Sequence, residues 1–294
     1  YFIMRSAIGV YAVAGLFYLA CATVLVAESR ERGNSSRFIP GIDAAEGLER
    51  MANFRQQRLQ GDYCFRFELE HLPRRGQAVV YQGTLWGSWN AIGPVSRFEL
   101  WPVNESGSDT VQRVELIIQN GSQLAVWMRQ GQSSGFQLVD GAALFEPIIP
   151  GVLYTPFDLQ MPFIYWNEFS YEGPSRVLSR IAQWFRMFPP EGSAAADYVQ
   201  AVRIGLDDTY DALLKVEVMG LDGAMRTDFK VESFKKVQQQ YIVKEIALKD
   251  YVTRDRTRFQ VKAASLDLNF DPSVFDPKLT LSVPEIPDVL FDAL

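Results

Sequence analysis

Apolar and polar side chains alternate along most of the chain, and this alternation predicts β-strands. The first such stretch places four aromatic or aliphatic side chains on one face and mostly charged ones on the other: Tyr63, Phe65, Phe67 and Leu69. The same period of two returns at 79–85, 98–100, 112–119, 122–129, 136–140, 198–205, 213–219, 225–234, 241–250 and 257–268. Roughly ten strands at this spacing predict a large antiparallel sheet, which must curl, split or close.

Two dipeptides predict tight turns within this sheet. Asn120-Gly121 lies between 112–119 and 122–129, and Asp222-Gly223 lies between 213–219 and 225–234. Both are dipeptides that two-residue hairpin turns favour, because Gly, Asn and Asp tolerate the left-handed backbone that such turns require. We therefore expect a β-hairpin at each position.

A helical period precedes the first strand. Asp43 followed by Glu46 resembles a capping box, and Gly61 suits the end of a helix. Between them, apolar residues recur at a spacing of about 3.6: Ala45, Leu48, Met51, Ala52 and Leu59. The pattern predicts one amphipathic helix that packs on the sheet.

The segment 141–176 follows neither period. It combines five prolines with many aromatic residues, and the prolines are Pro147, Pro150, Pro156, Pro162 and Pro174. The prolines exclude a long helix or an inner strand, and the aromatics exclude a solvated linker. Two interpretations stay open: a lid over the open side of the sheet, or a plug that completes the core. The next stretch, 177–188, fits either a helix or a strand.

The N-terminal part of the chain predicts export. Residues 6–27 contain no charge and follow Met4-Arg5, which is typical of a signal peptide, although a run of this length also spans a bilayer. Cleavage, retention as an anchor, and lipidation at Cys21 all stay open, and each of them exports the remainder. We expect a signal peptide or anchor in 1–27, a polar linker in 28–40 and one domain in 41–294, which is periplasmic or otherwise exported and could be tethered by 6–27.

Composition and charge narrow the functional classes. With 48% hydrophobic and 22% charged residues the chain is expected to form a packed core. A net charge of −6 without a block of basic residues argues against nucleic-acid binding. One histidine, His71, and two cysteines, Cys21 and Cys64, leave almost no imidazole or thiol chemistry.

The sequence offers no catalytic, metal or cofactor motif, so we predict a protein that is not an enzyme. Hydrolase, phosphate-binding and zinc signatures are missing from the sequence. The densest carboxylate cluster, Asp207, Asp208 and Asp211, is predicted to form a turn rather than a metal site. His71 is expected at a surface turn after the first strand, and Cys64 is expected to be a buried free thiol.

The order of several segments resembles the outer-membrane lipoprotein-sorting proteins, which include the periplasmic lipoprotein carriers. The resemblance covers about 44–277, and the segments that carry it are 157–163 (FDLQMPF), 171–174 (YEGP), 201–207 (AVRIGLD), 213–223 (LLKVEVMGLDG), 241–250 (YIVKEIALKD), 253–258 (TRDRTR) and 275–277 (FDP). It implies a mainly β (α+β) fold: a large curved antiparallel sheet that forms an unclosed barrel, with a helix and a lid over the concave face and an apolar hollow for acyl chains. By this resemblance 177–188 becomes a strand.

We expect the hollow to be lined by the apolar face of the strands and by the lid. The candidate lining residues on strands are Phe65, Phe67, Tyr81, Phe98, Leu100, Leu116, Ile118, Leu124, Val126 and Met128, and those in the lid are Phe157, Met161, Phe163 and Trp166. An apolar cavity of this kind suits a lipid tail. The same face could equally be a filled core.

The predicted function is an exported, non-catalytic binding protein that buries acyl chains of a lipid or lipoprotein. An inner- or outer-membrane acceptor protein is a candidate partner, nucleic acid is not, and no cofactor is expected. The alternative is a structural or interaction module of the cell envelope whose sheet is fully packed and has no ligand cavity.

Overall fold

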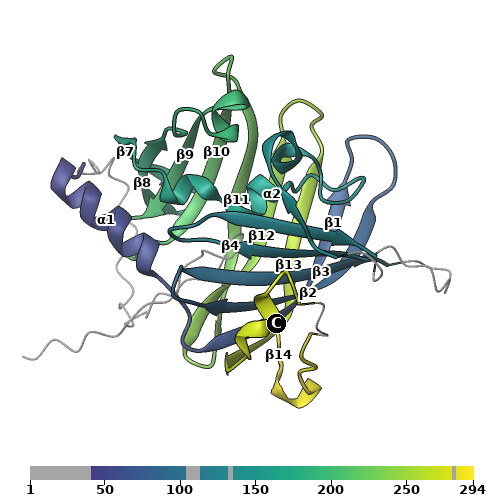
Figure 1. Ribbon diagram of the computed structural model, residues 1–294. Coiled ribbons are helices and arrows are strands. Elements are labelled where there is room, and N and C mark those ends of the chain that lie inside the picture. Colours follow the sequence, from purple (N-terminus) through teal and green to yellow (C-terminus); the bar gives the residue numbers. More distant parts are fainter. Residues whose placement is uncertain (1–40, 104–112, 132–134, 280–282) are drawn as a thin grey trace, which may run out of the picture.

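The computed structural model, shown in Figure 1, describes residues 41–103, 113–131, 135–279 and 283–294. Within these residues, fourteen strands form one antiparallel sheet whose two edges do not meet. The strands are β1 (Asp62–Leu72), β2 (Val79–Trp89), β3 (Pro94–Pro102), β4 (Val114–Gln119), β5 (Ala125–Gln130), β6 (Gln137–Val139), β7 (Phe169–Val177), β8 (Arg180–Met187), β9 (Val199–Asp207), β10 (Leu213–Gly220), β11 (Met225–Val237), β12 (Gln240–Asp250), β13 (Arg256–Leu268) and β14 (Asp292–Ala293). The predicted export segment 6–27 and linker 28–40 lie outside the described residues.

Two wings of sequential hairpins meet at the pairing of the first and the thirteenth strand. The sheet order is β6-β5-β4-β3-β2-β1-β13-β12-β11-β10-β9-β8-β7, with β14 added to β13. The sheet curves round so that its concave side faces the short helices of the connecting segment (Figure 1). The prediction of a large, curved, unclosed antiparallel sheet is confirmed.

The helical elements are few and short. They are α1 (Ala44–Gln56), η2 (Gly141–Phe145), α2 (Pro156–Gln160), η3 (Pro162–Tyr165), η4 (Ala194–Asp197), η5 (Pro272–Phe275) and η6 (Asp288–Leu290). The predicted helix is confirmed as α1, and Asp43 caps it by accepting the N–H of Glu46 at 2.8 Å. Its predicted end near Gly61 is wrong, because α1 stops at Gln56 and Leu59 lies beyond it.

The buried face of α1 differs from the predicted one. Gly47, Met51 and Phe54 are buried, whereas Leu48 is 61% exposed. A Cβ at Gly47 would lie 3.4 Å from the ring of Phe185, an ordinary contact distance, so Gly47 faces β8. The contact of α1 with the sheet therefore combines Met51 of the predicted stripe with Gly47 and Phe54, which lie outside that stripe.

One of the two predicted tight turns forms as expected. Asp222 accepts the N–H of Ala224 at 3.1 Å, and Gly223 has a φ of +75°, so this turn joins β10 and β11. The hairpin at Asn120-Gly121 also forms, since β4 and β5 pair antiparallel, but their pairing stops at Gln119 and Ala125 and leaves a five-residue loop in place of a two-residue turn.

The loop after β4 bonds to the neighbouring turn instead of closing on itself. The N–H of Asn120 donates to the carbonyl of Pro94, and the N–H of Ser122 donates to that of Ile92. A Cβ at Gly121 would lie 2.1 Å from the Ile92 oxygen, so glycine is required for this approach. The predicted two-residue type I′ turn is wrong because backbone donors of the loop are satisfied by the turn between β2 and β3.

The segment 141–176 also divides into two parts. Residues 141–166 remain mostly irregular, but Phe169–Val177 forms β7 at the edge of the sheet. Pro174 is tolerated there because an edge strand needs no donor on its outer side. The following stretch forms β8, so the interpretation of 177–188 as a strand is confirmed.

Candidate functional site: the concave face and its lid

The concave face of the sheet carries a continuous row of apolar side chains. Cross-strand partners connect Phe65 to Leu85, Leu85 to Phe98, Phe98 to Leu116 and Leu116 to Met128. Directly opposed residues in antiparallel strands project to the same side, so this row crosses five strands. It lies within the largest buried cluster of the described residues, with Met128 packed at its margin.

Most of the predicted strand lining lies in this cluster. Side chains that are at most 7% exposed are Phe65, Phe67, Tyr81, Phe98, Leu100, Leu116, Ile118 and Val126. Leu124 differs: it precedes β5 and is 40% exposed. The loop after β4 is longer than expected, and this places Leu124 outside the regular alternation of the strand.

Residues 141–166, which we call the lid, cover the concave face. The four predicted lid residues Phe157, Met161, Phe163 and Trp166 are all buried in the same cluster as the sheet residues. The centroids of the Phe157 and Phe163 rings are 5.9 Å apart, and Trp166 lies 6.2 Å from Phe163. These aromatic contacts give the lid a packed interior of its own.

The lid owes its compact shape to local capping rather than to a long helix. Thr155 and Asp158 form a reciprocal capping box at the start of α2, and Pro156 occupies the first helical position. The helix ends at Met161, which takes the left-handed conformation with a φ of 50°. Pro162 then begins η3. The sequence TPFDLQMP thus folds into two short turns that present Phe157 and Phe163 to the core.

Side chains, rather than backbone pairing, connect the lid to the sheet. The Tyr81 hydroxyl donates to the carbonyl of Pro150 at 2.9 Å, and the Thr257 hydroxyl accepts the N–H of Leu153 at 3.3 Å. In the described part of the chain, no backbone-to-backbone hydrogen bond joins 141–166 to a strand. The lid therefore lies on the sheet without being part of it.

The helix α1 holds the other end of the lid. Arg55 donates to the carbonyl of Ile164 at 2.6 Å and to that of Trp166 at 2.7 Å. Burial lowers the pKa of this guanidinium. The last carbonyls of a short helical turn have no further helical N–H to accept, and a cationic side chain commonly donates hydrogen bonds to them instead.

Two buried polar side chains of the lid face an apolar surrounding. Burial raises the pKa of Asp158 to about 6, although hydrogen bonds from Thr155 favour the carboxylate. The hydroxyl of Tyr154 is buried without a hydrogen-bond partner among the described residues, and its pKa is raised for the same reason. The site thus contains little that could activate a substrate and much that could contact a hydrocarbon chain.

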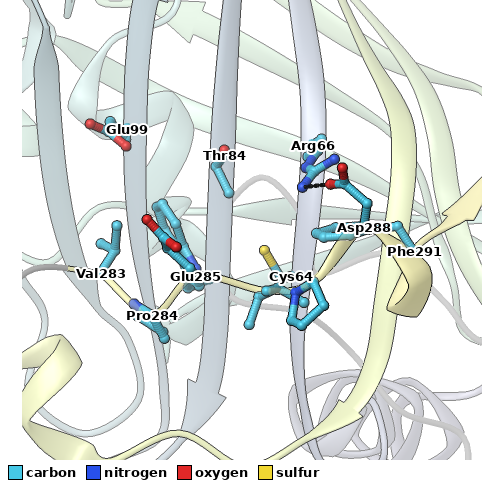
Figure 2. A pocket seen from close by; sticks show the side chains of 12 residues that line it. Cys64, Arg66, Thr84, Glu99, Val283, Pro284, Glu285, Asp288 and Phe291 are labelled. Atoms are coloured by element: carbon cyan, nitrogen blue, oxygen red, sulfur yellow. Dashed lines mark hydrogen bonds and ion pairs between the residues drawn. The ribbon is translucent and has the colours of Figure 1, made fainter.

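Side chains of the lid pack against the concave side. Three cavities of about 510, 420 and 300 Å³ lie on the opposite, convex face, and none of them is lined by a residue of the lid. The largest lies between β1–β3 and residues 283–291, where Arg66 and Asp288 form an ion pair (Figure 2). The Cys64 thiol at its floor is buried, as predicted, and burial raises its pKa to about 12.

His71 does not lie at a surface turn, and that prediction is wrong. The side chain is only 7% exposed, and Nδ1 lies 3.1 Å from the hydroxyl of Thr257 on the paired strand β13. Burial lowers the pKa of this imidazole. Because Thr257 also accepts the N–H of Leu153, His71 belongs to the polar contact that joins sheet and lid. No local pattern could predict this contact, since Thr257 lies 186 positions away.

The predicted carboxylate cluster is a turn that also receives α1. Asp207 accepts the N–H groups of Thr209 and Tyr210, which confirms the turn. Arg50 of α1 pairs with Asp211 at 2.9 Å and with Asp208 at 3.5 Å. Across the described residues, no three His, Cys, Asp or Glu side chains are grouped so that they could hold a metal ion. In the same residues, no helix combines the length and apolarity needed to cross a membrane.

Several solved structures share this architecture. Neither a family model nor a curated protein matches the sequence. Among solved structures, a DUF1329 family protein from Desulfovibrio piger ATCC 29098 matches with a TM-score of 0.66 at 10% identity, over 79% of this chain and 96% of that one. A putative outer membrane lipoprotein-sorting protein domain from Vibrio parahaemolyticus matches with a TM-score of 0.66 at 15% identity, over 80% and 97%.

A third structure, a LolA superfamily protein from Nitrosomonas europaea, matches with a TM-score of 0.55 at 12% identity, over 80% of this chain and 98% of that one. These structures are covered almost entirely, so the likeness extends over the whole half-barrel and not over one hairpin. At such identities it is a likeness of fold. The predicted resemblance is therefore confirmed at that level: this chain has the open half-barrel fold of the lipoprotein-sorting proteins.

Proposed function

We propose that the protein is an exported, non-catalytic carrier that buries the acyl chains of a lipid or lipoprotein between its concave face and its lid. The proposal places it in the periplasm or an equivalent compartment, with a membrane protein as acceptor of the cargo. The fold shared with lipoprotein-sorting structures supports this class of function. The residues that would contact the acyl chain are the buried strand and lid residues of the concave cluster.

The observation that carries the proposal is the way in which the lid is attached to the concave face. A layer of strands would be fixed by backbone ladders, whereas the lid contacts the sheet through apolar side chains and a few side-chain hydrogen bonds. An entering acyl chain could replace those apolar contacts, because burial is non-directional and worth about 0.8 kcal/mol per methylene. The described conformation is then the closed, unloaded state.

The packed module remains the second candidate, and one observation favours it. Phe157, Met161 and Phe163 are at most 3% exposed and already fill the concave side. If the lid never moves away from the sheet, the same residues form an ordinary hydrophobic core. Only a measurement of ligand uptake separates the two functions.

The test compares two cavity-forming substitutions on opposite faces. Phe163→Ala removes a ring that is 1% exposed from the lid, and Phe275→Ala removes a ring that is 8% exposed from the convex cluster. Each should lower the free energy of unfolding by about 3–5 kcal/mol. Only Phe163→Ala should favour the open lid, and we expect it to bind a fluorescent fatty acid about tenfold more tightly because more molecules are open.

Native mass spectrometry of the membrane-purified protein provides the independent readout. The carrier predicts co-purified lipid on the wild-type chain and on Phe275→Ala. Absence of lipid, together with no uptake by either variant, would establish the packed module instead. Equal gains in uptake for both variants would show general loosening and would also reject the lid as a gate.

A further inference from the structure

Two turns stand side by side at one end of the half-barrel, the upper edge in Figure 1. Together they expose arginines and apolar side chains. The turn after β1 and the turn after β12 are joined by a hydrogen bond from the N–H of Arg74 to Asp255 at 2.7 Å. We call their exposed residues the arginine rim, which consists of Arg74, Arg75, Tyr251, Val252, Arg254 and Arg256.

The rim is locally positive in an acidic chain. Its four guanidinium groups are exposed, and within the described residues none of them forms an ion pair. The two carboxylates of these turns are used by the backbone: Asp250 accepts the N–H groups of Val252 and Thr253, and Asp255 accepts that of Arg74. Four cations against two anions stand out where the whole chain has a net charge of −6.

The apolar part of the rim lies at the tip of the turn after β12. Val252 is 65% exposed and Tyr251 is 38% exposed. The ammonium of Lys249 lies 4.0 Å from the centre of the Tyr251 ring and holds the ring at the surface. Tyrosine favours the level of lipid headgroups, and arginine beside it favours their phosphates.

The backbone does not explain why an arginine occupies the centre of this turn. Arg254 has a φ of +67°, a conformation in which glycine or asparagine would cost less. The Arg254 side chain is exposed to solvent.

We propose that the arginine rim docks the protein onto an anionic bilayer surface, with Val252 and Tyr251 entering the headgroup layer. A protruding apolar tip flanked by cations fits a membrane better than an acidic protein, whose surface would leave Val252 unburied. The middle of the lid lies beside the rim, since Pro150 contacts Tyr81 and Leu153 contacts Thr257, the residue after Arg256. Docking brings this part of the lid to the bilayer, whether or not the protein carries a lipid.

The test uses the full chain with a dye at the rim, so that the signal reports on the surroundings of the rim and not on those of the apolar segment 6–27. In a Cys21→Ser background, with Cys64 buried, Val252→Cys is labelled with the environment-sensitive dye NBD. Val289→Cys is the matched control, because this valine is 89% exposed in the C-terminal segment at the other end of the molecule (Figure 1). Vesicles of phosphatidylcholine are compared with vesicles that also contain about one third phosphatidylglycerol.

We expect the emission at position 252 to rise and shift to the blue on anionic vesicles only, and position 289 to stay unchanged. High salt, about 0.5 M, should abolish the shift. The combined variant R74Q/R75Q/R254Q/R256Q should need at least about tenfold more anionic lipid for the same shift. Its thermal unfolding should match that of the parent, because none of the four side chains is buried.

Three outcomes would overturn the proposal: an equal shift on neutral vesicles, no shift on either kind, or a shift that the arginine substitutions leave intact. A shift with soluble polyglutamate but not with vesicles would assign the rim to an acidic protein instead. Failure of lipid uptake in the carrier test leaves these results unaffected, so the two proposals fail separately.

Discussion

The two faces of the same sheet are covered in different ways. On the concave face, apolar side chains of the lid pack on apolar side chains of the strands, with few polar contacts between them. On the convex face, the side chains of Arg97 and Arg129 bind one carboxylate, Glu115, and all three are at most 8% exposed. Directional ion pairs fix one arrangement, whereas apolar packing tolerates exchange of one partner for another. The convex face is therefore the rigid frame, and the concave face is where an exchange of contacts is physically easiest.

The convex network owes its burial to segments from elsewhere in the chain. The ring of Phe136 lies 4.7 Å from the Arg129 guanidinium, and the carbonyl of Val274 accepts from Arg97 at 3.1 Å. These contacts exclude water from the charges of β3, β4 and β5. Because these charges are desolvated, removal of any one of the three charged side chains is expected to lower the free energy of unfolding more than removal of an exposed partner would.

The largest effect expected from this comparison is the loss of the central carboxylate. Glu115→Gln keeps the shape but removes the negative charge that two buried guanidinium groups bind, so the free energy of unfolding should fall by about 3–5 kcal/mol. Glu99→Gln is the matched control, because Glu99 faces Glu115 across the strands and pairs with the half-exposed Arg113. It should lose less than about 1 kcal/mol in urea denaturation. Equal losses would mean that burial does not distinguish the two pairs.

The next effect is a pH dependence that belongs to the concave side. The pKa of Asp158 is raised from 3.8 to about 6, so the folded state binds a proton more tightly than the unfolded state does. Its contribution therefore makes the protein less stable as pH rises from about 4 to 6, by about 2–3 kcal/mol in total. Asp158→Asn removes this titration and should become more stable than the wild type above pH 6.

The measurement is the difference in unfolding free energy between variant and wild type across that range. Asp43→Asn is the control for an exposed capping carboxylate, because Asp43 accepts the N–H of Glu46 at the start of α1. It should change the free energy of unfolding by less than about 1 kcal/mol, since Asn caps a helix about as well as Asp does. A constant difference for Asp158→Asn across the pH range would show that the lid carboxylate is solvated, and hence that the lid opens readily in solution.

The sequence predicts which residues lie on the concave face far better than it predicts which segments cover either face. A period of two is enough to place Phe65, Phe67 and Leu116 on one side, because alternation is a local property of a strand. The confirmed turn at Asp222-Gly223 is equally local. The positions that sequence reasoning misplaced depend on partners far along the chain, such as Thr257 beside His71 and Pro94 beside Asn120.

The convex network could not be predicted for the same reason. Arg97, Glu115 and Arg129 occupy alternate positions that look like a solvated face of three strands. They are buried because Phe136 and the segment with Val274 fold over them. Likewise, the composition of 141–176 identified an apolar cover, but its division into a lid and the edge strand β7 follows from pairing with β8. Periodicity reports which face a residue occupies and not what comes to lie on it.

The smallest effect concerns the C-terminal segment on the convex face, where charge is exposed. Asp288 binds Arg66 at 2.6 Å, but its side chain is 86% exposed and that of Arg66 is 45% exposed. Asp288→Asn should change the free energy of unfolding by less than about 1 kcal/mol, because solvent screens the pair. Arg66 also retains its contact with the ring of Phe291, whose centre lies 4.1 Å from the guanidinium. The segment should therefore stay in place, and its amide hydrogen exchange should remain close to that of the wild type.

Glu285→Gln is the control, since Glu285 is exposed in the same segment without an ion pair among the described residues. A loss above about 2 kcal/mol for Asp288→Asn alone would mean that exposed charges fix this cover as firmly as the buried network fixes the strands below it, and the contrast between burial and exposure on the convex face would fail.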